Sequence, residues 1–227
     1  VELKARFDEE QNINWAEELE RAGVNVVYGF AGLKIHAKLC LVVRREPKGM
    51  RRYAHIGTGN YNASSAKIYT DLGLFTARDD ICSDVQDLFN VMTGFGVIDN
   101  YRRIFVSPNH LRANITRLIR EEAEIHRAKG GGRIIMKCNQ LVDQGIVREL
   151  YEASRAGVKI ECVVRGICSL RPGIKNVSET ISVHSIVGEL LEHARIYYFE
   201  HGGEPVMYVG SADMMTRNLN GRIEVLT

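Results

Sequence analysis

A histidine and a basic residue stand two positions apart at two places in the sequence: His36 precedes Lys38, and His193 precedes Arg195. In a β-strand, residues at positions i and i+2 point to the same face. Each pair therefore presents an imidazole and a cation side by side. A neutral imidazole is a good nucleophile toward phosphorus, and a neighbouring cation neutralises charge on phosphoryl oxygens. The two pairs predict a site for phosphoryl transfer, with Lys38 and Arg195 binding phosphate.

A turn of small and polar residues follows each pair. The first turn is GTGN at residues 57–60, with Asn62 just beyond it, and the second is GSAD at residues 210–213. Glycine lets backbone N–H groups approach an anion closely, and the amides of Asn60 and Asn62 can donate hydrogen bonds to phosphoryl oxygens. A single histidine in an apolar strand is more often a hydrogen-bonded core residue than a catalyst, but two such arrangements rarely coincide by chance.

The two arrangements belong to a longer internal repeat. A helix-forming stretch, an Ala-Gly-Val stop and a β-branched run occur at residues 16–29 and again at residues 148–166. Gly23 and Gly157 stand where the end of a helix needs a left-handed residue. The repeat predicts two similar α/β lobes, each a mixed sheet flanked by helices. A pseudo-twofold axis between the lobes would bring His36 and His193 to one shared cleft.

The segment between the copies predicts a long helix and a domain boundary. An amphipathic pattern runs from Pro108 to Lys129, with Ser107 as its N-cap and Pro108 at the first helical position. We therefore place the boundary near residues 100–107, with a first lobe at residues 1–105 and a second at residues 106–227. The chain opens without Met inside an apparent strand, so we expect it to be part of a longer enzyme.

Composition and charge narrow the class of protein. The 227 residues can bury a sizeable core, and the net charge of +2 provides no global field for nucleic acid, so we expect no nucleic-acid partner. The five cysteines form no C-x-x-C pair, which favours free thiols in a reducing compartment. No apolar run is long enough for a transmembrane segment, and no signal peptide is visible. We expect a cytoplasmic protein, and peripheral contact with the membrane stays open.

Two family resemblances rest on these motifs. H-x-K followed by G-[ST]-x-N, in two copies, resembles the phospholipase D superfamily, although Val43 and Glu200 stand where that pattern usually has Asp. Longer strings resemble the two C-terminal domains of bacterial polyphosphate kinase, the ATP-dependent polyphosphate-synthesising type, over nearly the whole chain. These strings are VELKARFDEEQNINWAEELERAGV, GLKIHAKLCLV, YAHIGTGNYNASSAKIYTDLGL, VRGICSL and GSADMMTRNLNGRIEV.

The second resemblance implies an activity and a set of site residues. It implies reversible transfer of the γ-phosphate of ATP to the end of a polyphosphate chain, with Mg²⁺ and in a homo-oligomer. His36 matches the histidine that becomes phosphorylated, and His193 matches a second essential histidine near the nucleotide phosphates. Tyr69 and Arg165 match residues that contact ATP, and Arg6 matches an arginine credited with the magnesium site. Because a guanidinium offers no lone pair to a metal, we expect Arg6 to contact the phosphate oxygens that Mg²⁺ bridges.

Other interpretations stay open beside this one. A phospholipase D-like phosphodiesterase or nuclease would use the same two histidines without a nucleoside triphosphate, although Val43 in place of Asp argues against it. A non-enzymatic module would bind polyphosphate without turnover. Arg165 follows the apolar run IECVV, and ligands bind at the strand ends of α/β sheets, so its own position also favours phosphate contact. For Arg217 and Arg222 the sequence favours phosphate binding and a surface position equally.

Overall fold

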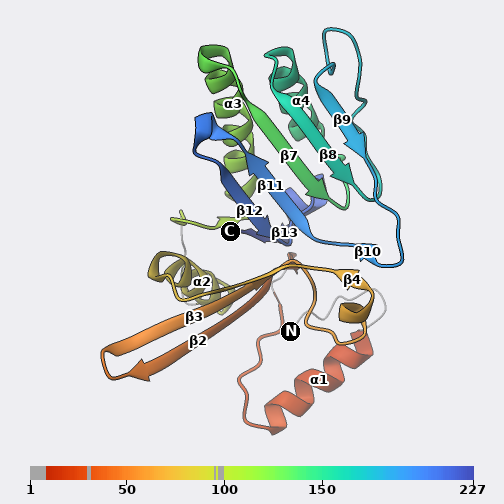
Figure 1. Cartoon of the computed structure of the whole chain (residues 1–227). Coiled ribbons are helices and arrows are strands. Elements are labelled where there is room, and N and C mark those ends of the chain that lie inside the picture. Colours follow the sequence, from red (N-terminus) through yellow and green to blue (C-terminus); the bar gives the residue numbers. More distant parts are fainter. Residues whose placement is uncertain (1–8, 30–31, 95, 97–99) are drawn as a thin grey trace.

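Two lobes make up the structure, and both contain helices packed on a β-sheet. The computed structural model describes residues 9–29, 32–94, 96 and 100–227 (Figure 1). In the view of Figure 1 the larger lobe lies above the smaller one, and the C-terminal end lies near the level where the lobes meet. The prediction of two α/β lobes is confirmed. No helix among the described residues is long and apolar enough to cross a membrane.

A seven-stranded mixed sheet forms the centre of the second lobe. Its strands, in sheet order, are β6 (Phe105–Val106), β14 (Val225–Leu226), β12 (Val206–Gly210), β11 (Arg195–Phe199), β7 (Arg133–Cys138), β8 (Lys159–Val164) and β9 (Ile181–His184). β7, β8 and β9 run parallel, and the other neighbours are antiparallel. Alternate residues of β7 and β8, such as Met136 and Ile160, are buried because one face packs on α3 (Leu111–Lys129) and α4 (Gln144–Arg155).

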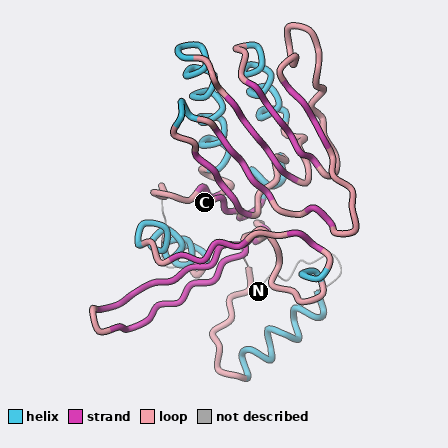
Figure 2. The backbone as a smooth tube through the Cα atoms, in the orientation of Figure 1, coloured by secondary structure: helices cyan, strands magenta, loops and turns pink. Residues whose placement is uncertain are grey.

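The first lobe holds a smaller antiparallel sheet. Its strands, in the order β2-β3-β5, are β2 (Lys38–Glu46), β3 (Gly49–Gly57) and β5 (Gly73–Thr76). β2 and β3 form a long hairpin that extends away from the rest of the molecule (Figure 2). The helix α2 (Asp79–Met92) packs on one face and buries Ile56 and Leu88 together with Ile223 and Val225 of the other lobe. The lobes therefore share a hydrophobic core, which holds them in one arrangement.

The remaining elements are short or peripheral. They are α1 (Glu9–Arg21), β1 (Lys34–Ile35), η1 (Ser65–Lys67), β4 (Tyr69–Thr70), β10 (Leu191–Glu192), η2 (His201–Gly203), α5 (Thr216–Gly221) and β13 (Arg222–Ile223). The expected β-branched strand after α1, at residues 24–29, is irregular in the structure. The matching run of the second lobe forms β8, which pairs with β7 and β9. Without such neighbours among the described residues, the backbone groups of residues 24–29 have no ladder to join.

The long helix begins later than the sequence indicates. α3 starts at Leu111 with His110 at the N-cap, instead of at Pro108 with Ser107 as the cap. The Ser107 hydroxyl donates to the carbonyl oxygen of Arg222 at 2.7 Å and accepts from the N–H of Glu224 at 3.1 Å. Ser107 therefore ties the segment before α3 to the C-terminal strands, and this contact replaces the expected cap.

Two short parallel ladders join the lobes, and they are equivalent under the internal repeat. β1 pairs with β13, so that Lys34 lies opposite Arg222, and β10 pairs with β4, so that Leu191 lies opposite Tyr69. Each ladder joins one strand from each lobe. One ladder ends immediately before His36, and the other ends immediately before His193. The predicted pseudo-twofold relation is confirmed at the level of single residues.

Candidate active site

Each histidine forms a hydrogen bond with a carboxylate of the opposite lobe. His36 Nδ1 lies 2.9 Å from Glu224 Oε2, and His193 Nδ1 lies 2.8 Å from Asp71 Oδ1. Both contacts follow directly from the ladders, since each carboxylate stands one residue beyond the strand that pairs beside its histidine. A carboxylate accepts hydrogen bonds only, so Nδ1 of each ring carries the proton. The lone pair of each neutral ring is then on Nε2, the atom that can attack phosphorus or accept a proton.

The carboxylate beside His36 is buried and held by further contacts. Glu224 is 0% exposed, and its Oε1 accepts from Asn218 Nδ2 at 2.6 Å. Its backbone N–H donates to Ser107 Oγ. Because both carboxylate oxygens and the backbone are occupied, Glu224 can adopt one orientation, and it presents Oε2 to His36 Nδ1. This arrangement fixes the His36 ring and its tautomer.

The carboxylate beside His193 is more open. Asp71 Oδ1 also accepts from Thr58 Oγ1 at 2.6 Å, which links it to the turn after β3. A Cβ atom on Gly59 would lie 2.0 Å from Asp71 Oδ2, so only glycine at position 59 leaves room for this carboxylate. Burial alone would raise the pKa of Asp71, but the hydrogen bonds from His193 and Thr58 outweigh burial and lower that pKa. Asp71 is therefore an anion at neutral pH.

Burial and nearby cations keep both imidazoles neutral. Burial lowers the pKa of His36, and the charges of Lys38 and Arg195 act in the same direction, against the opposing effect of Glu224. Burial also lowers the pKa of His193, as do Arg195 and Lys38, while Asp71 opposes them. The same two cations act on both rings, so the structure brings the two histidine pairs together at the junction, as the repeat predicts.

Lys38 is buried beside His36, opposite the first glycine of its turn. It pairs with Gly57 across β2 and β3, just as Arg195 pairs with Gly210 across β11 and β12. Its Nζ donates to the carbonyl oxygen of His36. Burial lowers the pKa of Lys38 to about 7, with Arg195 and Arg222 acting in the same direction and Glu224 in the opposite one. An arriving anion would restore the charge of this ammonium.

Tyr69 and Arg165 both lie next to His193. The rings of Tyr69 and His193 have centroids 4.7 Å apart at an angle of 37°. Arg165 Nη1 donates to the carbonyl oxygen of Glu192 at 3.2 Å, one residue before His193. The structure therefore brings both residues to the side of the site that contains His193.

The predicted asparagines and Arg6 are placed differently. Asn60 and Asn62 are exposed, and Asn62 Oδ1 accepts from the N–H groups of Ser64 and Ser65 at 3.0 and 2.9 Å. The side-chain oxygen of Asn62 therefore closes a local turn, and a contact of either amide with phosphate stays a prediction. Arg6 lies outside the described residues.

Asp71 and Glu224 are the residues of the candidate site that the sequence motifs did not reveal. Each stands eleven positions after the last residue of its small-residue turn, Asn60 or Asp213. Extending the alignment of the two copies by that distance would have found them, because carboxylates at matching positions beyond matching turns are a repeated signal.

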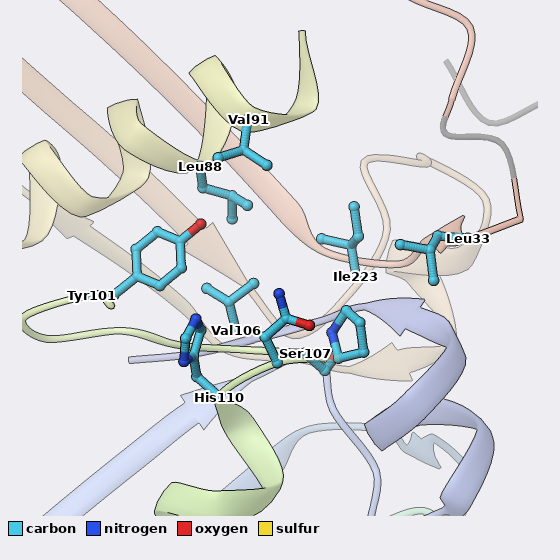
Figure 3. A pocket seen from close by; sticks show the side chains of 10 residues that line it. Leu33, Leu88, Val91, Tyr101, Val106, Ser107, His110 and Ile223 are labelled. Carbon is cyan, nitrogen blue, oxygen red and sulfur yellow. The ribbon is translucent and has the colours of Figure 1, made fainter. Parts of the chain in front are cut away.

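A separate cavity of about 160 Å³ lies between α2 and the junction (Figure 3). Leu88 and Val91 of α2, Tyr101, His110 and Ile223 line it, together with Ser107. Neither histidine of the two pairs lines this cavity, and its walls are mainly apolar. It lies beside β13, which ends one residue before Glu224, and it is not the candidate active site.

Comparison with known proteins identifies the family. Residues 1–98 match the model of polyphosphate kinase C-terminal domain 1, and residues 104–227 match that of polyphosphate kinase C-terminal domain 2. The whole chain is 56% identical to polyphosphate kinase 1 of Chlorobaculum tepidum and 56% identical to the polyphosphate kinase of a Synechocystis strain. It spans 32% and 31% of those two proteins, about a third of the length of the relatives it matches.

A solved structure agrees with the sequence comparisons. The crystal structure of polyphosphate kinase from Porphyromonas gingivalis superimposes on 100% of this chain with a TM-score of 0.89 and 40% identity, and 37% of that protein is covered. The resemblance carried by the long sequence strings is thereby confirmed. Both family models and both relatives agree, so the chain belongs to the polyphosphate kinase family.

Proposed function

We propose that the complete protein is a polyphosphate kinase that transfers the γ-phosphate of ATP to the end of a polyphosphate chain, reversibly, through phosphohistidine at His36. The observation that carries this proposal is the pair of contacts between histidine and carboxylate across the lobes. Each contact holds a neutral ring with its Nε2 lone pair available, beside buried cations. The relatives that cover the whole chain are named polyphosphate kinases, which supports the same activity.

The first half-reaction begins at His36 Nε2. The lone pair on Nε2 attacks the γ-phosphorus of ATP, an N–P bond forms, and the bond from phosphorus to the bridging oxygen breaks, so that ADP leaves. The phosphorylated ring keeps its proton on Nδ1 and is cationic, and the buried carboxylate of Glu224 stabilises that charge. Lys38 is placed to neutralise charge on the oxygens of the transferred group.

The second half-reaction returns the phosphoryl group to a chain end. An oxygen of the terminal phosphate of polyphosphate attacks the phosphorus, the N–P bond breaks, and the lone pair returns to His36 Nε2. Neutral His193 can accept the proton of that terminal phosphate at its own Nε2, while Asp71 stabilises the imidazolium that forms. In the reverse direction His193 returns the proton.

Tyr69 and Arg165 support a nucleotide site on the His193 side of the junction. Both lie against His193 or the residue before it, and Arg165 adds a cation at the end of β8. We propose that they bind ATP, with Lys38, Asn60 and Asn62 on the phosphate groups.

The proposed magnesium ion fits as part of the substrate and not as a resident ion. Within the described ranges, no three His, Cys, Asp or Glu side chains form a group that could hold a metal. Asp71 and Glu224 are already bound to the histidines, and Asp213 is paired with Arg195. Mg²⁺ commonly binds to substrate phosphates with few protein ligands. We therefore propose MgATP as the substrate. A contact between Arg6 and its phosphates stays a prediction.

Three further predictions remain part of the proposal. They are the division into lobes at residues 1–105 and 106–227, the cytoplasmic location, and assembly as a homo-oligomer. In the structure the predicted boundary falls inside β6, which pairs with β14 of the larger sheet. Polyphosphate and the ATP/ADP pair are the proposed partners, and we expect no nucleic acid.

Labelling of the complete protein with γ-labelled ATP tests the proposal. We expect an acid-labile, alkali-stable label on the wild type, and its loss in His36→Ala, because the attacking nitrogen is removed. His184→Ala is the matched control, since His184 is exposed on β9 and takes no part in the site. Label that persists in His36→Ala, or an active wild type that forms no such label, would contradict the proposed mechanism.

A further inference from the structure

The contacts of Arg195 assign it a role different from that of Lys38. We infer that Arg195 is a positioning residue that joins the two lobes and holds His193, and that it does not bind the phosphoryl groups of the substrate. This inference rests on the proposed function, because it concerns a residue of the same site. It replaces phosphate binding, which the spacing of His193 and Arg195 alone predicts.

The guanidinium of Arg195 is surrounded by acceptors of the protein itself. Nη2 donates to Asp213 Oδ2 at 3.1 Å, and Nη1 donates to the carbonyl oxygens of His193 at 2.9 Å and Thr58 at 3.2 Å. With the Asn139 amide oriented to satisfy both of its atoms, its oxygen lies 2.5 Å from Nη2 and 3.1 Å from Nε. All three nitrogens therefore have partners, and the side chain is 4% exposed. A phosphoryl group could reach Arg195 only by displacing them.

Several of these contacts close a circuit that crosses the junction. Arg195 Nη1 donates to the carbonyl oxygen of Thr58, and Thr58 Oγ1 donates to Asp71 Oδ1. The same Asp71 oxygen lies 2.8 Å from His193 Nδ1, and Arg195 in turn binds the carbonyl oxygen of His193. Two residues of each lobe form the circuit. Arg195 therefore sets the position of His193 relative to its carboxylate.

Arg195 also acts on the imidazole ring itself. Its Nη1 lies 3.1 Å from His193 Nε2 and 3.3 Å from His193 Nδ1. A donor in line with one ring nitrogen would lie much farther from the other, so Nη1 lies against the ring. The Tyr69 ring also contacts this ring, at a tilt of 37°. After burial, the charge of Arg195 is a cause of the lowered pKa of His193, with Lys38 in the same direction and Asp71 opposed. The contact leaves the in-plane lone pair of Nε2 for substrate.

Lys38 occupies the equivalent position in the first copy but has a different set of contacts. Among the contacts described for its ammonium, one acceptor receives a hydrogen bond, the carbonyl oxygen of His36. An ammonium has three donors, so two remain for an anion. A planar guanidinium with five donors suits a position with several fixed acceptors. The difference in contacts explains why the second copy carries arginine where the first carries lysine.

Kinetics of Arg195→Lys in the complete protein test this inference. The substitution keeps the charge but loses the planar set of five N–H donors. We therefore expect kcat to fall at least about tenfold, while KM for ATP and for polyphosphate stays within about twofold. Arg165→Lys is the matched comparison, because Arg165 is the proposed ATP contact, and we expect a higher KM for ATP there. A raised KM with unchanged kcat in Arg195→Lys would overturn the inference.

A structure of the wild-type protein with a non-hydrolysable ATP analogue makes the test independent of the variant's folding. We expect Arg195 to keep its contacts with Asp213 and Thr58, with no phosphate oxygen at hydrogen-bond distance. A phosphate oxygen within about 3.2 Å of any Arg195 nitrogen would overturn the inference. Failure of the wild type to form phosphohistidine would remove the proposed function instead, and it would leave these contacts unchanged.

Discussion

The two histidine centres are built on one plan but differ in rigidity and in charge. At His36 the carboxylate is fully buried, both of its oxygens are occupied, and the neighbouring lysine keeps donors for an anion. At His193 the carboxylate is a quarter exposed, and the neighbouring arginine is saturated by the protein. The first centre is therefore suited to accept a phosphoryl group. The second is suited to bind the nucleotide and to transfer a proton.

The crossed contacts also show why both lobes are needed. Each histidine receives its carboxylate from the other lobe, so neither lobe contains a complete centre. The shared core beneath the junction, with Ile223 and Val225 packed among residues of the first lobe, keeps the lobes from separating. The two centres can thus differ in chemistry while the two short ladders that position them stay alike, because single side chains differ between the copies.

The largest difference between the centres is expected for removal of the carboxylate charge. In Glu224→Gln, Asn218 donates to the position of Oε1, so the new amide must turn its NH₂ group toward His36 Nδ1. The His36 proton then moves to Nε2, and the attacking lone pair is lost. We expect the rate of phosphohistidine formation to fall about 10³-fold. Asp71→Asn should cost about 10²-fold at most, since its oxygen can still face His193.

Rapid-quench measurement of the label, with a melting curve for each variant, checks this ordering. Equal losses in Glu224→Gln and Asp71→Asn, in proteins that melt like the wild type, would show that the two centres do not differ in the way described. A larger loss in Asp71→Asn would reverse the assignment of nucleophile and proton acceptor.

The pH dependence of the reaction should report the charge states of Lys38 and His36. Lys38 has a pKa of about 7 in the free protein because of its burial, so its charge is lost as pH rises through that value. We expect kcat/KM to fall above about pH 7, while kcat stays high to higher pH, because bound phosphate raises the pKa of Lys38 again. The lowered pKa of His36 places the acid limb below the usual histidine value of about 6.5.

Lys38→Arg checks the origin of the alkaline limb. A guanidinium stays protonated across this range, so an active Lys38→Arg variant should lose the fall in kcat/KM above pH 7 while it keeps the acid limb. An alkaline limb that is unchanged in this variant would assign it to another group. Profiles of kcat/KM and kcat from pH 5 to 9 decide between these outcomes.

The sequence predicted the parts of the site that the chain repeats locally, and it missed those that arise only on folding. The spacing of His36 and Lys38, and the turn that begins at Gly57, are strand and turn patterns within one segment. The contact between His36 and Glu224 spans 188 residues, and no local pattern encodes it. The saturation of Arg195 likewise depends on acceptors from other segments of both lobes, such as Thr58.

Two errors in the expected elements have the same cause. The run at residues 24–29 has strand-forming residues, but a strand needs a neighbour, and the described residues supply none there. Ser107 is a good N-cap by type, but the hydrogen bonds it forms with Arg222 and Glu224 use its hydroxyl elsewhere. In both cases tertiary contacts overrode a local preference.

The smallest expected effect tests whether the rigidity of the His36 centre matters. Ser107 is 1% exposed, donates to the carbonyl oxygen of Arg222, and accepts the N–H of Glu224. Ser178 is equally buried and makes the same two kinds of contact far from the site, with Arg171 and Ile174. Each Ser→Ala change leaves a backbone N–H without its acceptor and should lower the free energy of unfolding by about 1–3 kcal/mol.

Only Ser107→Ala should also slow phosphohistidine formation, by about threefold, because Glu224 then loses one of the two hydrogen bonds that join its backbone to Ser107 beside His36. Chemical denaturation gives the two stabilities, and single-turnover labelling gives the two rates. If Ser178→Ala slowed the reaction as much as Ser107→Ala, the loss would reflect general stability and not the position of Glu224. Similar stabilities with different rates would instead show that the buried carboxylate must be held in place for His36 to react.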